Sequence, residues 1–322
     1  MKQFTIQPGE AGQAVLKYLS RLLPGATMGL LRKSMRKKNI TVNQKKIEGR
    51  EKLKTGDVVT VWFSEETLLH FMGQQEEKIP AGKWNDFAKY IVYEDENLLV
   101  LNKPAGLLSQ GDGSGTASLN DGLLSYLHNQ VTSTVKPSVC NRLDRNTSGL
   151  VLAGKTILGL QELNRLIKDH RLRKKYKALV YGVLQGDGIL KGYLVKNHET
   201  NQVTFSKVPK KGAVPIESRY RVIAHLSIQG ILATLVSVTL VTGRSHQIRI
   251  HFSSLGHPLL GDRKYGNPES VSASEKLHIG RQMLHAFQIT FPSDLESLKN
   301  LEGKTFQAPL PKDFSRLLRD IK

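Results

Sequence analysis

The stretch NRLDRNTSGLVLAGK, residues 141–155, divides into a polar half and an apolar half. The apolar half predicts a buried strand, and the polar half predicts a tight turn because it ends in Thr-Ser-Gly. Within the turn one carboxylate, Asp144, lies between Arg142 and Arg145. Positive neighbours favour the ionised form of a carboxylate, which can act as a nucleophile or stabilise a cation. A turn held by a surface salt bridge is an equally simple structural alternative.

The same region contains a false phosphate-loop match, GLVLAGKT, at residues 149–156. In a true phosphate loop an apolar strand comes before the glycine-rich residues, whose amides then bind phosphate. Here the four middle residues are themselves apolar and a polar segment precedes them, so nucleotide hydrolysis is not favoured. The glycine-rich residues 111–118 predict a mobile loop that ends with Ser118 as the N-cap of a helix.

Around this stretch, residues 89–322 predict one domain with strands and helices in irregular order. Strand patterns occur in NLLVLNKP, GLVLAGK, KYKALVYGVL and a strand-rich run to about Val241. Helical patterns occur in SLNDGLLSYLHNQ and LGLQELNRLIKDHRL. Because neighbouring strands joined by short turns outnumber strand-helix-strand units, the pattern favours an α+β fold with a large, mixed, mostly antiparallel sheet.

Residues 1–64 predict a separate small module with 13 Lys or Arg and only 4 Asp or Glu. AVLKYLSRLL has helical apolar spacing, and GLLRKSMRKKNI predicts a second, strongly basic helix. The segments ITVNQKKI and LKTGDVVTVWF predict strands of a small curled sheet. Residues 65–88 have no sustained periodicity and predict a linker between this module and the large domain.

The basic helix concentrates four positive charges, on Arg32, Lys33, Arg36 and Lys37. Like charges four residues apart on a helix repel by a few tenths of a kcal/mol per pair, roughly. Such a cluster therefore indicates an external anion, although a simple solvated helix face is the plain alternative.

The whole chain carries a formal charge of +19 and has a pI near 9.9. A field of that sign attracts polyanions, with nucleic acid as the first candidate and an anionic membrane surface as the second. No apolar run approaches the roughly 20 residues that span a bilayer, and the N-terminus lacks the pattern of a signal peptide. We therefore expect a cytoplasmic protein that does not enter a membrane.

Metal and thiol chemistry are not favoured. His246, His251 and His257 are five and six residues apart, which does not match the helical pairing of zinc sites. We expect ordinary hydrogen-bonded histidines and no bound metal. The lone Cys140 has no neighbouring base that would activate a thiol, so it is interpreted as a packing residue.

The segment TGRSHQIRIHFSSLGHP, residues 242–258, predicts a turn and then a helix N-capped by Ser245. Arg249 lies off the apolar face of that helix and can point toward Asp144. In RKKYKALVYG, Tyr176 begins a strand, where it can be a half-buried strand residue or can stack on a base. The apolar face of the predicted helix is formed by Ile248, Phe252 and Leu255.

Five separated motifs together resemble the RluA-type RNA pseudouridine synthases over roughly residues 90–310. They are ENLLVLNKPAGLLSQ, NRLDRNTSGLVLAGK, KKYKALVYG, TGRSHQIRIHFSSLGHPLLGD and RQMLHA, in the order and spacing of that family. The basic module, through LLRKSMRKKNITVNQKKI and LKTGDVVTV, resembles the S4-type RNA-binding domain that often precedes that catalytic domain.

The resemblance implies a role for several residues. Asp144 corresponds to the catalytic aspartate, Tyr176 to the tyrosine beside the target base, and Arg249 to the basic partner of the aspartate. Arg142 would lie near the flipped nucleotide, and Lys103 of NKPAG would lie near the cleft and bind RNA. One departure is Asn141, which stands where many members have histidine, and we expect it to affect loop packing or RNA contacts.

The implied reaction is the isomerisation of uridine to pseudouridine in structured RNA by a monomer that needs no cofactor. Large-subunit (23S) ribosomal RNA, or a ribosome-assembly intermediate, is the first candidate substrate, and transfer RNA stays open. A non-catalytic RNA-binding or ribosome-assembly factor on the same fold is the alternative function.

Overall fold

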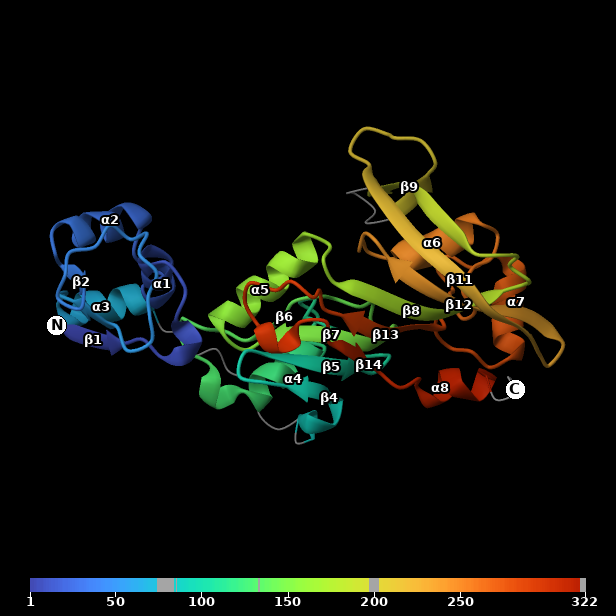
Figure 1. Cartoon of the computed structure of the whole chain (residues 1–322), viewed down its shortest axis with the longest axis horizontal. Helices are drawn as coiled ribbons and strands as arrows, with labels where there is room; N and C mark the ends of the chain where they lie inside the picture. The colour runs from blue at the N-terminus through green and yellow to red at the C-terminus, as the bar shows by residue number, and fades with distance from the viewer. Residues whose placement is uncertain (74–83, 85, 133, 197–202, 319–322) are drawn as a thin grey trace. The chain divides into compact units, whose positions relative to one another are not determined.

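The computed structural model describes residues 1–73, 84, 86–132, 134–196 and 203–318 (Figure 1). The chain forms two compact units, each built from more than one stretch of sequence. The first unit contains Met1–Leu99, Ser118–Cys140 and Leu152–Arg165, and the second contains Val100–Ala117, Asn141–Val151 and Leu166–Lys322. Every residue expected to act on the target base therefore lies in the second unit.

Two helices and a three-stranded antiparallel sheet form the N-terminal module. Its elements are β1 (Lys2–Thr5), η1 (Pro8–Glu10), α1 (Val15–Leu22), α2 (Met28–Arg36), β2 (Ile40–Val42) and β3 (Val58–Val61), with strand order β1-β3-β2. The helical apolar spacing of α1 buries Leu19 in the same apolar cluster as Leu31 of α2 and Val59 of β3. Both predicted helices and the strands β2 and β3 are confirmed. The return strand expected at the end of ITVNQKKI is reduced to an isolated bridge between Val42 and Lys45, and the third strand of the sheet is β1, which was not predicted.

The segment predicted as a linker begins with a helix, α3 (Glu65–Met72). The hydroxyl of Ser64 accepts a hydrogen bond from the backbone N–H of Thr67 at 3.2 Å, which caps the helix. Leu68 is buried in the same apolar core as α1 and α2. The linker prediction is therefore wrong for residues 65–72, and residues 74–83 and 85 lie outside the described part of the chain.

An eleven-stranded sheet dominates the rest of the chain, with the order β10-β9-β11-β12-β8-β13-β7-β5-β4 and with β14 and β6 paired to β13 and β7. From β10 through β9, β11, β12 and β8 to β13 the neighbouring strands are antiparallel, as are the pairs β13-β14 and β6-β7, whereas β13 and β7 are parallel. The predicted α+β architecture with a mostly antiparallel sheet is confirmed. The strands are β4 (Ile91–Glu94), β5 (Leu98–Lys103), β6 (Ser138–Val139), β7 (Ser148–Gly154), β8 (Arg173–Tyr181), β9 (Gly188–Lys196), β10 (Val203–Ser206), β11 (Val214–Ile228), β12 (Ile231–Leu240), β13 (Leu284–Thr290) and β14 (Thr305–Gln307).

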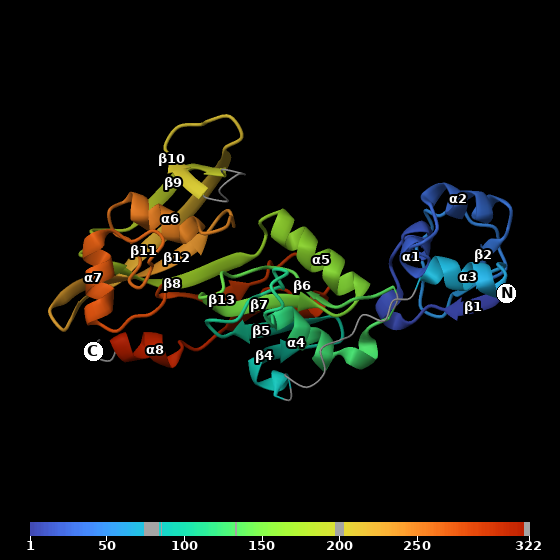
Figure 2. The same ribbon diagram turned by 180° about the vertical axis from the view of Figure 1, so that it is seen from behind.

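The longer helices are α4 (Leu119–Tyr126), α5 (Ile157–Lys168), α6 (Gln247–Ser254) and α7 (Pro268–Lys276), followed by the short α8 (Lys312–Ser315). Short 3-10 turns are η2 (Phe87–Tyr90), η3 (His128–Gln130), η4 (Lys299–Leu301) and η5 (Arg316–Leu318). Ser118 caps α4 in a reciprocal capping box with Asp121, as predicted. In the two opposite views of Figures 1 and 2, α6 and α7 lie beside β11 and β12. Among the described helices, none combines the length and the apolar character that a bilayer crossing requires.

The false phosphate-loop sequence forms β7, and all seven of its residues are buried. The lysine that follows, Lys155, forms an ion pair with the carboxylate of Glu94 at 2.5 Å and donates to the carbonyl oxygen of Asp95 at 2.9 Å. Because these residues form a core strand and an internal ion pair, they do not build a phosphate cradle.

Candidate active site

A tight turn carries Asp144 into the start of β7. The carbonyl oxygen of Asp144 accepts a hydrogen bond from the backbone N–H of Thr147 at 3.0 Å. Gly149 has a φ of +114°, and a Cβ there would lie 2.2 Å from the carbonyl oxygen of Ala286 in β13. Only glycine fits this close approach of two parallel strands, so the backbone of the turn is fixed at its C-terminal end.

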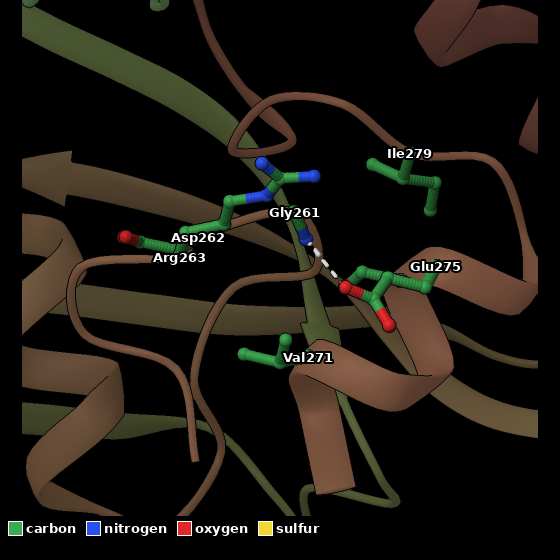
Figure 3. Close-up of a pocket in the computed structure, with 7 residues that line it drawn as sticks. Gly261, Asp262, Arg263, Val271, Glu275 and Ile279 are labelled. Carbon is green, nitrogen blue, oxygen red and sulfur yellow. Dashed lines mark hydrogen bonds between the residues drawn. The ribbon is translucent and has the colours of Figure 1, made fainter. Parts of the chain in front are cut away.

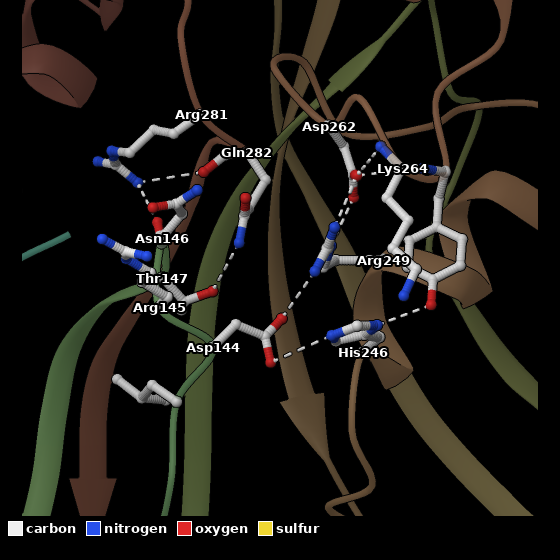
Figure 4. Close-up of polar contacts among 12 residues, drawn as sticks. Asp144, Arg145, Asn146, Thr147, His246, Arg249, Asp262, Lys264, Arg281 and Gln282 are labelled. Atoms are coloured by element: carbon white, nitrogen blue, oxygen red, sulfur yellow. Dashed lines mark hydrogen bonds and ion pairs between the residues drawn. The ribbon is translucent and has the colours of Figure 1, made fainter. Parts of the chain in front are cut away.

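The side chain of Asp144 forms an ion pair with Arg249 of α6, whose Nη1 lies 3.1 Å from Oδ2 of Asp144 (Figure 4). The same guanidinium donates two hydrogen bonds to Asp262, from Nε to Oδ2 at 2.6 Å and from Nη2 to Oδ1 at 2.8 Å. The carboxylate of Asp262 is 1% exposed and the side chain of Arg249 is 9% exposed. The predicted contact between Arg249 and Asp144 is present, and Arg249 is held rigidly by a second carboxylate.

Arg249 stays positively charged although its side chain is buried. Burial opposes the charged form, but Asp262 and then Asp144 outweigh burial, so the pKa of Arg249 is raised. Asp262 also accepts hydrogen bonds at Oδ1 from the backbone N–H groups of Lys264 (3.0 Å) and Tyr265 (3.2 Å). Asp262 was not singled out from the sequence, because it is 13 residues from Arg249 and is part of an ordinary Gly-Asp turn.

A small cavity lies behind the turn of Asp262. It has a volume of about 10 Å³ and is lined by Gly261 of that turn, Val271 of α7 and Ile279, which follows α7 (Figure 3). Gly261 has a φ of +79°, and a Cβ there would lie 1.8 Å from the carbonyl oxygen of Arg281. A volume of this size holds at most one water molecule, so the cavity is a packing gap that supports the turn.

Tyr176 lies on β8 between Val238 of β12 and Ala286 of β13. Its side chain is buried, and burial followed by the charge of Asp144 raises its pKa. The phenol therefore keeps its proton at neutral pH. Its position supports the predicted proximity to Asp144, while its role in the reaction stays a prediction.

Comparisons with known proteins show the family of this chain. A family model described as RNA pseudouridylate synthase matches residues 97–254. The chain is 33% identical over 327 residues to the ribosomal large subunit pseudouridine synthase C of Pasteurella multocida, covering 100% of this chain and 94% of that protein. The chain belongs to the RNA pseudouridine synthase family.

Two further comparisons extend this result. The ribosomal large subunit pseudouridine synthase D of Nitrosomonas europaea is 29% identical, covering 99% of this synthase and 88% of that protein. The solved structure of human RNA pseudouridylate synthase domain containing 4 has a TM-score of 0.57 and 24% identity, over 72% of this chain and 92% of that chain. RluA-type membership and the pseudouridine synthase fold are thus confirmed, whereas the S4-like identity of the N-terminal module stays a prediction.

Lys103 lies close enough to Asp144 to feel its charge, as the resemblance suggested, but it is not exposed to RNA. Its side chain is fully buried, and Nζ donates to the carbonyl oxygens of Pro104 (2.9 Å), Leu107 (2.7 Å) and Arg145 (3.0 Å). Burial lowers the pKa of Lys103 to about 7, although Asp144 acts in the opposite direction. The prediction of an RNA contact is wrong here, because three backbone acceptors hold the amine inside the protein.

The two arginines that flank Asp144 differ in their contacts. Arg145 joins the turn to the segment after β5, since its Nε donates to the carbonyl oxygen of Gly106 at 3.0 Å. Its own carbonyl oxygen accepts hydrogen bonds from the N–H of Gly106 and from Nζ of Lys103. Arg142 is exposed to solvent, which is compatible with the predicted contact to RNA.

The helix that supplies Arg249 begins differently from the prediction. The N-cap of α6 is His246, with a left-handed φ of +57°, and not Ser245. The side-chain oxygen of Gln247 accepts a hydrogen bond from the backbone N–H of Arg244 at 3.1 Å. A side chain of the helix itself therefore stabilises the turn that precedes it. Leu255 was also assigned wrongly to the apolar face, because it is 39% exposed beyond the end of the helix.

The three histidines of this region are hydrogen-bonded, as predicted. Nδ1 of His251 lies 3.0 Å from the hydroxyl of Ser218, and Nδ1 of His257 lies 2.9 Å from the carbonyl oxygen of Tyr181. His246 differs because its Nε2 also lies 3.8 Å from Oδ1 of Asp144. Over the described ranges of the chain, no group of three His, Cys, Asp or Glu side chains is arranged to hold a metal.

Cys140 and the basic helix α2 lie in the first unit. Burial raises the pKa of the Cys140 thiol to about 12, in agreement with a packing role.

The side of α2 opposite its buried residues Leu31 and Met35 carries the predicted charges. This surface, called the α2 basic face below, consists of the exposed residues Arg32, Lys33, Arg36 and Lys37.

Proposed function

We propose that this synthase converts uridine to pseudouridine in large-subunit ribosomal RNA, with Asp144 as the catalytic carboxylate and without a cofactor. The observation that carries the proposal is the carboxylate of Asp144, a quarter exposed and held at one oxygen by a guanidinium that Asp262 fixes in place. The choice of RNA is supported by relatives that are named ribosomal large subunit pseudouridine synthases C and D.

The proposed reaction needs no redox partner and no donated group. The bond between N1 of uracil and C1′ of the ribose breaks, and a bond between C5 and C1′ forms. C5 loses one proton and N1 ends with one, so the atoms and electrons balance. The ionised Asp144 can either add to the base or assist at the ribose, by an adduct at C1′ or by proton loss at C2′.

The other site residues fit this reaction in different ways. Arg249 keeps Oδ2 of Asp144 next to a positive charge, which favours the ionised carboxylate. The neutral phenol of Tyr176 offers a ring on which the uracil can stack. A uracil inside a helix is out of reach, so the target base is flipped out or already unpaired, and flipping costs a few kcal/mol, roughly.

Contacts with phosphate offset that cost. We propose that Arg142 beside the catalytic turn and the α2 basic face bind the RNA backbone, since both are exposed and positively charged. The N-terminal module then acts as an S4-like RNA-binding domain for the catalytic unit.

The substitution Asp144→Asn tests the catalytic part of the proposal. It removes the charge at nearly constant size, so we expect tritium release from C5-labelled uridine in a ribosomal RNA transcript to be abolished while RNA binding persists. The exposed Asp294→Asn serves as the matched control with unchanged turnover. Full activity of the Asp144 variant would exclude the proposed mechanism.

A second experiment tests the substrate. Pseudouridine is mapped in ribosomal and transfer RNA from cells with and without the gene. We expect the loss of one or more sites in large-subunit ribosomal RNA, whereas an unchanged map would favour a non-catalytic RNA-binding or assembly factor.

A further inference from the structure

The imidazole of His246 faces the oxygen of Asp144 that Arg249 does not contact. Nε2 of His246 lies 3.8 Å from Oδ1 of Asp144, whereas Nη1 of Arg249 lies 3.1 Å from Oδ2 (Figure 4). Each carboxylate oxygen therefore has its own nitrogen partner. The distance from His246 exceeds a direct hydrogen bond, but catalytic contacts that are long in a free enzyme tighten when substrate binds.

The opposite side of the imidazole is fixed by Tyr265. Nδ1 of His246 lies 2.7 Å from the phenolic oxygen of Tyr265, and the two rings meet edge to face with centroids 5.4 Å apart. The backbone N–H of Tyr265 donates to Asp262, and its ring lies under the guanidinium of Arg249 at 5.0 Å. The turn that holds Arg249 thus also holds the ring that orients His246.

We propose that Tyr265 donates its phenolic proton to Nδ1 of His246, so that the imidazole presents Nε2–H to Oδ1 of Asp144 and acts as a positioning residue. This inference rests on the proposed catalytic role of Asp144. Oδ2 is paired with the cation of Arg249 while Oδ1 faces a neutral donor, so Oδ1 keeps more electron density and is the oxygen that reacts.

The protonation of both rings supports this arrangement. Burial lowers the pKa of His246; Arg249 and Lys264 act in the same direction, and Asp144 and Asp262 oppose them. Burial raises the pKa of Tyr265, and although Arg249 opposes this, the phenol keeps its proton. A neutral imidazole beside a protonated phenol accepts at Nδ1 and carries its own proton on Nε2.

Two substitutions separate this role from a purely structural one. The amide of Asn reaches the position of Nδ1 and can still contact Tyr265, and Asn also tolerates the left-handed φ of +57° at this residue. The longer Gln reaches the position of Nε2 and can donate to Asp144. If His246 only keeps the backbone conformation or contacts Tyr265, Asn is therefore the better replacement. If His246 donates a hydrogen bond to Asp144, Gln is the better replacement.

The experiment measures kcat and KM of the full-length enzyme on a ribosomal RNA transcript. For His246→Gln we expect kcat within about threefold of wild type, and for His246→Asn a decrease of about tenfold or more with KM unchanged, which is the effect of removing one hydrogen bond. Tyr265→Phe removes the hydrogen bond that fixes the tautomer of His246, so we expect a kcat between those of His246→Gln and His246→Asn. Wild-type kcat in the Asn variant, or equal losses in the Asn and Gln variants, would overturn the inference.

A matched control measures the backbone effect. His278 is exposed and also has a left-handed φ, of +52°, so His278→Gln and His278→Asn report the cost of these residues in that conformation through thermal melting. Asp144→Asn is assayed in parallel. Retained activity in that variant removes the proposed function itself, whereas an inactive Asp144 variant beside a fully active His246→Asn enzyme removes only the role of His246.

Discussion

Asp262→Asn tests whether the buried carboxylate of Asp262 holds Arg249 in place. The change removes one negative charge that is 1% exposed and leaves the guanidinium of Arg249, 9% exposed, with Asp144 as its remaining partner. Breaking a buried ion pair by removing one charge costs about 3–5 kcal/mol. Because Asp144 still offsets part of the arginine's charge, we expect a loss of about 3 kcal/mol in unfolding free energy, the lower end of that range.

Urea unfolding of the full-length protein, followed by fluorescence and circular dichroism, measures this loss. The matched control is Asp294→Asn, which removes the carboxylate of another Arg-Asp pair, with Arg171, but at a side chain that is 78% exposed. An exposed pair contributes at most about 1 kcal/mol, so the control is expected to fall below that. If Asp262→Asn destabilises the protein no more than the control, the assignment of Asp262 as the anchor of Arg249 is refuted.

Three more predictions rest on charge and burial. Neutralising the α2 basic face is expected to weaken RNA binding and to flatten its salt dependence, by about 0.7–0.9 in the slope for each RNA phosphate that is no longer neutralised, as measured by filter binding. An unchanged salt dependence would mean that the α2 basic face is only solvated and does not bind RNA. The thiol of Cys140, with its pKa raised to about 12, is expected to react with a disulfide reagent at pH 8 only after unfolding, and rapid labelling of the native protein would contradict this. Burial lowers the pKa of His251 to about 4, so between pH 6.5 and 4 the unfolded state binds more protons. As the pH falls through that window, the free energy of unfolding of the wild type is expected to decrease relative to that of His251→Phe, by up to about 1.4 kcal/mol per pH unit. If urea unfolding shows the same difference between the two proteins at every pH, the prediction is contradicted.

Most of the fold follows from short-range pattern. The periodicity of α1 and α2, the N-cap at Ser118 and the apolar run of β7 are local, and the structure confirms each. β1 was missed because it is short and has a single apolar residue. α3 is as long as α1, but it was missed because its apolar residues do not form one buried face: Leu68 is buried, whereas Leu69 is 62% exposed. α3 is fixed by its cap and by the burial of Leu68 in a core that α1 and α2 create, which is a long-range effect.

The candidate site was predicted only in part. The sequence predicted that Arg249 lies next to Asp144, although the two residues are 105 positions apart. It did not indicate Asp262 or Tyr265, and it assigned His246 only as an ordinary hydrogen-bonded histidine. The sequence also predicted that Lys103 binds RNA. In the structure, Lys103 of the NKPAG segment makes an internal contact between loops, because its amine donates to backbone carbonyl oxygens.

The sequence by itself determined the family, the two helices and strands of the basic module, and the carboxylate that the site is built around. These properties depend on residue type, order and periodicity, which act over a few neighbouring residues. The tertiary structure alone decided which charges are paired and which are exposed. The pairing of β8 with β12 and β13 and the packing of α6 bring loops from distant positions together, and burial there sets the partners of Arg249, Lys103 and His246.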